Sequence, residues 1–354
     1  EPSSTRDRLE LRQLLKLGGP LMTTLNYAHT SVLEVYDRAR ELGANSGEHE
    51  ALFGAVRGLW QGAIGRSDYG SAGRLADEML ALATRANEPA LLLEAHRAVG
   101  NSAFWPGHFQ KAQRSMHNAV QISQSQPAGP LPAGFSQDPD IANRGLYAWT
   151  LASLGCPRSA GEQLDRALER AYTLQHPFSM AYAVGSAMWT YFVLRDTALA
   201  ADFAKQMIAV SHEYAFPYFA VAGQVVQHWV RAQDGESHAA LTDLVATLQA
   251  WRDTSAGIGM AIFLYTQAEV EALCGKPRDA LNTLADPLLV ERLEVEQWYL
   301  ADVERLRGAC EVQLGQTSAA LVSLRTARRI ATEQNARVAA LRIACLEAQH
   351  FGRD

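Results

Sequence analysis

LGCPRSAGEQLDRALERA, residues Leu154 to Ala171, joins the end of one predicted helix to the start of the next. Gly155 suits the left-handed residue that follows a helix, and Pro157 suits the first turn of the following helix. Ala160 and Ala167 then lie seven residues apart on that second helix. The stretch therefore predicts a helical hairpin with a tight turn and a packing face of small residues.

The same pattern recurs along most of the chain at a spacing of 40 residues, with one longer step of 48. The alanine near the start of the second helix recurs as Ala72, Ala112, Ala160, Ala200, Ala240, Ala280 and Ala320. The glycine five residues before it recurs as Gly107, Gly155, Gly235, Gly275 and Gly315. A further small-residue slot, seven residues before that glycine, holds Gly100, Ala148, Ala268 and Gly308. Self-similarity at a fixed period is the signature of a repeat array.

The register predicts three parts: N-terminal capping helices in 1–50, seven hairpins in 51–335, and a C-terminal capping helix and tail in 336–354. Each hairpin would hold two helices of about 16 residues. Apolar residues are spaced by three and four throughout, so the predicted class is all-α. The hairpins are expected at 51–86, 89–125, 138–175, 178–215, 218–252, 257–293 and 297–335.

Two segments depart from the register. The Pro-rich stretch 125–139 supplies the eight extra residues and is expected to be a loop, either a tolerated surface insertion or a loop over the binding face. At its end, Asp138-Pro139 is typical of an N-cap followed by the first helical residue. Near the N-terminus we expect a helix over Arg6–Leu17, broken at Gly18-Gly19-Pro20.

Composition and motifs favour a protein without catalytic chemistry. The formal net charge of −6 gives no general attraction to nucleic acid or to anionic membranes. No run of 18 apolar residues and no signal peptide are found, which predicts a cytoplasmic protein without a membrane partner. The sequence holds no phosphate-binding loop, no zinc motif and no nucleophile elbow, so we expect no catalytic residue, cofactor or metal. Because it begins with Glu1, we expect a piece of a longer protein.

The small-residue slot, the glycine turn and the paired alanines resemble the tetratricopeptide (TPR) repeat. That resemblance implies a right-handed superhelix of helical hairpins with a concave groove. The unit here is 40 residues rather than about 34, so both helices should be longer than in the common form. The spacing alone would also suit HEAT-type repeats, but the Gly/Ala register favours TPR.

A closer resemblance covers nearly the whole chain. The segments that carry it are Glu10–Gly43, Leu52–Trp60, Glu88–Trp105, Ser136–Ala142 and His176–Ala183. They are similar to the C-terminal TPR region of bacterial multidomain signalling proteins, in which a class III adenylate cyclase or winged-helix regulator and a STAND-type predicted ATPase come first. The resemblance implies a sensor or scaffold segment, with any catalysis in domains absent from this chain. That family usually shows Gly-Gln-Asp-Pro-Gly where this chain has Ser-Gln-Asp-Pro-Asp at 136–140, so a shared role of the loop stays open.

Aromatic residues form the candidate binding site. Trp149, Trp189 and Trp229 are 40 residues apart and follow the small-residue slot, which in the TPR pattern faces the concave groove. The alternative is that longer helices turn these side chains into the core between repeats. The other predicted groove residues, in comparable slots, are Tyr182, Phe192, Tyr265, Phe104, Arg97 and Asn101.

We therefore predict a non-catalytic sensor or scaffold that binds a peptide or protein segment in its groove and regulates a linked ATPase, cyclase or transcription regulator. The segment could belong to another domain of the parent protein, and a small apolar ligand is also compatible with the groove. Two alternatives remain. One is a free-standing cytoplasmic receptor for a signalling peptide. The other is an α/α-toroid carbohydrate-active enzyme with sugar stacked on the tryptophans, which would need two carboxylates about 5–9.5 Å apart.

Overall fold

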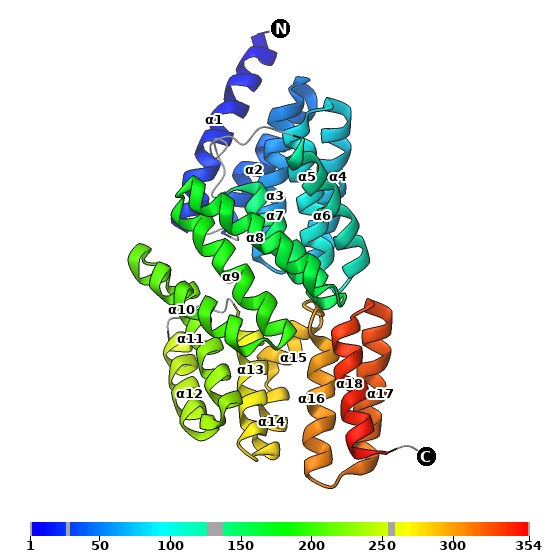
Figure 1. Cartoon of the computed structure of the whole chain (residues 1–354). Helices are drawn as coiled ribbons and strands as arrows, with labels where there is room; N and C mark the ends of the chain where they lie inside the picture. The colour runs from blue at the N-terminus through cyan, green and yellow to red at the C-terminus, as the bar shows by residue number, and fades with distance from the viewer. Residues whose placement is uncertain (1, 26–28, 126–136, 254–258, 353–354) are drawn as a thin grey trace. The chain divides into compact units, whose positions relative to one another are not determined.

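The computed structural model describes residues 2–25, 29–125, 137–253 and 259–352, and every regular element in these ranges is a helix (Figure 1). The predicted all-α class, a TPR-like array of helical hairpins, is confirmed. The chain divides into two compact units, residues 1–143 (unit 1) and 144–354 (unit 2), which are described separately. None of the described helices is both long and apolar enough to cross a membrane.

Unit 1 is built from helices that each pack against the next one along the chain. One of its buried clusters includes Phe53, Trp60, Met79 and Leu82. Residues 139–143 belong to the start of α7 (Pro139–Ser153), whose remainder lies in unit 2. The other helices of unit 1 are α1 (Pro2–Leu25), α2 (Thr30–Ser46), α3 (His49–Gly65), α4 (Tyr69–Ala86), α5 (Pro89–Phe104) and α6 (Phe109–Gln124).

Unit 2 continues the hairpin pattern, and α18 packs against both α16 and α17 (Figure 1). After the rest of α7 it contains α8 (Pro157–Leu174), α9 (Pro177–Leu194), α10 (Thr197–Tyr214), α11 (Pro217–Arg231), the π-helical turn η1 (Ala232–Glu236), α12 (Ser237–Asp253), α13 (Met260–Leu273), α14 (Pro277–Leu284), α15 (Pro287–Leu293), α16 (Leu300–Gln313), α17 (Thr317–Gln334) and α18 (Arg337–His350).

The residues that define the register have a clear structural role. All seven register alanines are completely buried. The five register glycines have φ between 71° and 100°, which is the left-handed turn that ends the first helix of a hairpin. Gly100 belongs to the other small slot: a Cβ there would lie 2.6 Å from Met116 Cγ on the partner helix. Small residues therefore let the two helices of a hairpin approach closely.

The predicted break at Gly18-Gly19-Pro20 is wrong, because α1 continues to Leu25. Gly18 is instead required for packing: a Cβ there would lie 2.4 Å from the Tyr36 ring. Gly58 in α3 meets the same ring, with a Cβ position 2.3 Å from it. The two glycines thus accommodate one buried tyrosine. We attribute the continuation of α1 past Pro20 to its packing against α2 and α3.

The sixth hairpin also differs from expectation, because its second helix is divided into α14 and α15. Asp286 accepts a hydrogen bond from the Leu288 backbone N–H (2.9 Å) and Pro287 starts the new helix, a favourable helix beginning.

The predicted loop 125–139 lies largely outside the described residues, which resume at Gln137. The predicted cap at its end is confirmed. Asp138 Oδ1 accepts from the backbone N–H groups of Asp140 and Ile141, both at 3.0 Å.

Candidate functional site

The three predicted tryptophans lie on the first helices of successive hairpins in unit 2. Trp149 and Trp189 stack with ring centroids 6.0 Å apart and planes within 2°. Trp189 also stacks on Phe263 at 6.4 Å, and Trp149 meets Trp298 edge-on at 4.7 Å. Trp229 is completely buried, Trp189 is 6% exposed and Trp149 is half-buried. Trp149 and Trp189 therefore stack on each other, whereas Trp229 meets Phe192 at a tilt, and aromatic residues from later hairpins cover part of the row.

The predicted aromatic groove residues differ in how much of their side chains is exposed to a ligand. Phe192 and Tyr265 are 3% and 2% exposed, so in this structure they contribute mainly to the core of unit 2. Tyr182 is half-buried, like Trp149. The groove role of these two half-buried residues stays a prediction.

The other three predicted residues belong to unit 1. Phe104 is completely buried and packs against Phe109 at a centroid distance of 5.7 Å. Asn101 accepts a hydrogen bond from the Trp105 indole N–H at 3.1 Å. Arg97 forms a two-pronged pair with Glu94, at 2.7 Å for each hydrogen bond.

The Glu94 carboxylate is itself 1% exposed and also receives the Arg57 guanidinium at 2.8 Å. Burial would raise the pKa of Glu94, but the adjacent charges of Arg97 and Arg57 outweigh it and hold the pKa below its ordinary value. Arg97 lies over the Trp60 ring at 4.9 Å. This buried network connects α3 to α5 within unit 1.

Arg195 in unit 2 breaks the repeat register. It stands 40 residues after Gly155, in the slot that holds glycine in five hairpins, and has φ 62°. Ser67, with φ 57°, fills the same slot in the first hairpin. A left-handed conformation costs a non-glycine residue roughly 1–2 kcal/mol. The missing glycine was visible in the sequence, but the prediction overlooked it.

The Arg195 side chain is 22% exposed and its guanidinium meets four neighbours. It pairs with Glu269 at 2.7 Å and donates to the Tyr265 hydroxyl at 3.1 Å. It also lies over the rings of Phe192 and Trp229, at 5.2 and 5.1 Å. The Trp229 indole N–H donates to Glu269 at 3.1 Å, so the tryptophan row and Arg195 share one carboxylate.

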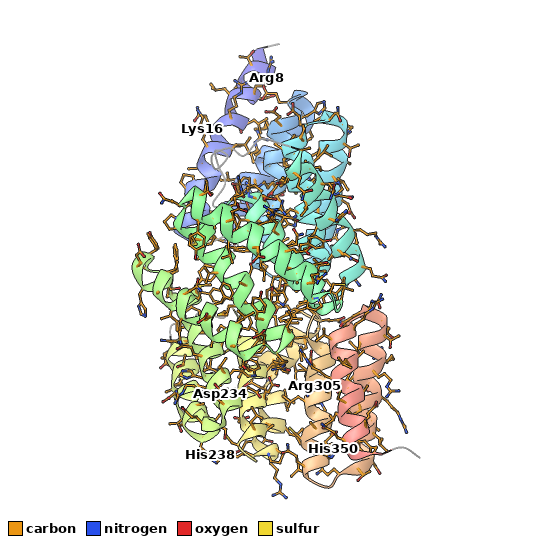
Figure 2. The ribbon with its side chains drawn as sticks, in the orientation of Figure 1. Arg8, Lys16, Asp234, His238, Arg305 and His350 are labelled. Atoms are coloured by element: carbon orange, nitrogen blue, oxygen red, sulfur yellow. The ribbon has the colours of Figure 1, made fainter. Side chains whose placement is uncertain are left out.

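Two further arginines extend this network. Arg305, on α16 (Figure 2), donates to Asp302 at 3.1 Å and lies 3.7 Å from Glu269. Arg342, on α18, donates to the same Asp302 oxygen at 3.0 Å and to the Val193 carbonyl at the end of α9. We call the three arginines Arg195, Arg305 and Arg342 the arginine cluster. It links α9, α13, α16 and α18.

The charges of the network do not cancel. Three guanidiniums face two carboxylates, Glu269 and Asp302, which leaves a net charge of 3 − 2 = +1. Burial opposes ionisation of Asp302, but Arg342, Arg305 and Arg195 together hold its pKa well below the ordinary value. Burial, reinforced by Glu269, raises the pKa of Tyr265 to about 12, so its phenol stays neutral. The cluster therefore favours a bound anion.

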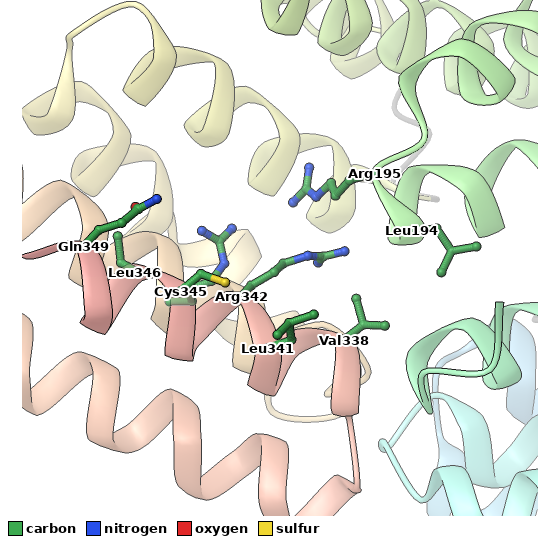
Figure 3. Close-up of a pocket in the computed structure, with 9 residues that line it drawn as sticks. Leu194, Arg195, Val338, Leu341, Arg342, Cys345, Leu346 and Gln349 are labelled. Atoms are coloured by element: carbon green, nitrogen blue, oxygen red, sulfur yellow. The ribbon is translucent and has the colours of Figure 1, made fainter.

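A pocket of about 480 Å³ opens beside the cluster, and Figure 3 shows Arg195 and Arg342 reaching into it from the end of α9 and from α18. The α18 residues give it an apolar side and an exposed thiol, that of Cys345. The lining residues are Leu194, Arg195, Arg305, Val338, Leu341, Arg342, Cys345, Leu346 and Gln349.

The cluster carboxylate Asp302 differs from the acid of a glycosidase. A glycosidase needs a carboxylic acid with a raised pKa, whereas the pKa of Asp302 is lowered. The described residues also contain no group of three or more His, Cys, Asp or Glu side chains that could hold a metal ion.

The sequence matches no family model and no curated protein. Among solved structures, the chain is similar to a Rap protein complexed with competence and sporulation factor. The TM-score is 0.65 at 15% identity, over 94% of this chain and 99% of that one. The apo form of RapI gives a TM-score of 0.46 at 14% identity, over 85% and 82% of the two chains. The first likeness shows a shared helical-repeat fold.

Proposed function

We propose that this chain is a non-catalytic helical-repeat receptor that binds a peptide at the arginine-cluster pocket of unit 2. The observation that carries the proposal is Arg195, which stands in a slot that holds glycine in five hairpins and directs its guanidinium into the pocket network. A pocket with an apolar side and a few convergent polar groups is the usual form of a ligand site.

The structural comparison supports the receptor interpretation. The Rap protein with this fold was solved in complex with competence and sporulation factor, so a protein of the same fold binds another molecule of that name. This favours a free-standing receptor over a scaffold segment. All four cysteines are free, which agrees with the reducing cytoplasm as its location.

The resemblance to multidomain signalling proteins supports the competing proposal, in which the chain is a segment of a longer protein and controls a linked ATPase, cyclase or transcription regulator. Arg342 would carry the signal, since it joins the last helix, α18, to the end of α9 across 149 residues of sequence. A ligand that changes this contact would change how the hairpins of unit 2 pack together.

Selection from random peptide libraries tests the proposal. One library is tethered through its N-terminus, leaving the C-terminus free, and a second is tethered through its C-terminus. We expect at least one to yield peptides that bind the wild-type chain and lose about tenfold or more in affinity for Arg195→Gly, which removes the guanidinium but suits the turn.

The matched control is Arg329→Ala, because Arg329 is an exposed arginine on α17 that pairs only with Glu333 among the described residues. Its affinity should equal that of the wild type. Absence of enrichment from both libraries, or equal binding by Arg195→Gly, would refute the proposal.

A further inference from the structure

We infer that the arginine-cluster pocket takes the free C-terminal carboxylate of a peptide whose last side chain is apolar. The inference deepens the proposed function and rests on it. It begins from unused hydrogen-bonding capacity. Each guanidinium has five N–H donors, and most of those on Arg195, Arg305 and Arg342 have no acceptor among the described residues.

The charge of the site selects the anion. One carboxylate would neutralise the excess of +1 left by three guanidiniums and two acidic side chains. A phosphate group, with close to two negative charges, would over-compensate beside Glu269 and Asp302. The planar guanidinium fork also matches a planar carboxylate, with two parallel hydrogen bonds.

The apolar side of the pocket selects what carries the carboxylate. Leu341 is 65% exposed and lines the pocket together with Val338 and Leu346 on the same helix. Burying such surface stabilises a complex by about 25 cal/mol per Å². The ligand should therefore place an apolar group directly beside its carboxylate.

In a C-terminal residue, the carboxylate and the apolar side chain are both attached to one Cα atom. An internal Asp or Glu carries its carboxylate on its own side chain, and the apolar group would have to come from a neighbouring residue. A simple fatty acid also joins a carboxylate to an apolar body, but it lacks the peptide N–H and C=O groups that could bond to Gln349 at the pocket wall. We therefore assign the pocket to a peptide.

The test compares one selected peptide as the free acid, as the C-terminal amide and as the N-acetylated acid, by fluorescence anisotropy against the wild-type chain. We expect amidation to weaken binding by about tenfold or more, because it removes a charge-assisted interaction. Acetylation should change the affinity by less than about twofold, because the N-terminus lies outside the pocket. In Arg342→Gln the penalty for amidation should shrink.

The outcomes separate the two proposals. Equal binding of acid and amide, with binding still lost in Arg195→Gly, would overturn the inference and leave the receptor function standing. Failure of every peptide to bind would overturn both. Competition by octanoate at lower concentration than by N-acetyl-leucine would assign the pocket to a fatty acid and overturn the peptide assignment.

Discussion

Replacing Trp189 by alanine tests whether the tryptophan row is part of the core of unit 2. Trp189 is 6% exposed and lies between Trp149 and Phe263, with Phe192 edge-on at 5.3 Å. A buried tryptophan removes about 150–250 Å² from water, worth roughly 4–6 kcal/mol. Measured losses for such truncations are about 3–5 kcal/mol. We expect a loss of about 4 kcal/mol in the free energy of unfolding.

Urea denaturation followed by far-UV circular dichroism measures this loss. The slope of the unfolding free energy against urea is about 3 kcal/mol per molar or more for a chain of this size, so the midpoint should fall by roughly 1 M. The control is Tyr172→Ala, because Tyr172 on α8 is 59% exposed and its loss should stay within about 0.5 kcal/mol. If Trp189→Ala behaved like the control, Trp189 would not be a core residue, and its interpretation as a groove residue would be favoured.

Three further predictions concern backbone strain, acid stability and close packing. Arg195→Gly should be about 1 kcal/mol more stable than Arg195→Ala in urea denaturation, because glycine accepts φ 62° without strain; equal stabilities would contradict the left-handed turn. Because the pKa of Asp302 is lowered in the folded state, its ionised carboxylate stabilises the fold at pH values above the ordinary pKa of 3.8. This stabilisation is lost as the pH falls through the folded-state pKa. In Asp302→Asn the free energy of unfolding should therefore fall less steeply as the solution is acidified. An unchanged acid dependence would show that the ion pairs of Asp302 contribute nothing to stability. Gly18→Ala should lower the thermal midpoint because its Cβ meets Tyr36, whereas Gly73→Ala, with open space, should hold or raise it; a stabilised Gly18→Ala would refute the close contact.

The hairpin register could be predicted because its cause is local. Gly155 must adopt a left-handed turn, and Ala160 must let two neighbouring helices touch, so both requirements recur in every repeat. The same register also indicates Arg195, because this residue stands where the repeat calls for glycine. Attention to the repeats that break the pattern would have found the candidate site.

Other features could not be predicted because they depend on residues distant in sequence. Gly18 and Pro20 resemble a helix break until the Tyr36 ring is placed against the helix. The period assigns Trp189 to a helix face but does not reveal that Phe263 covers it. The bond from Arg342 to the Val193 carbonyl spans 149 residues and has no counterpart in a 40-residue repeat.

The most direct measurement of the central claim is the alkylation rate of Cys345, which is exposed and lines the pocket. Iodoacetamide labelling, resolved for each cysteine by mass spectrometry, is followed with and without a peptide selected from the libraries. Cys156 lies outside the pocket lining and serves as the internal reference. A peptide held in the pocket should slow Cys345 labelling about tenfold at ten times its Kd and leave the Cys156 rate unchanged. An unchanged Cys345 rate at saturating peptide would contradict the assignment of the binding site to this pocket.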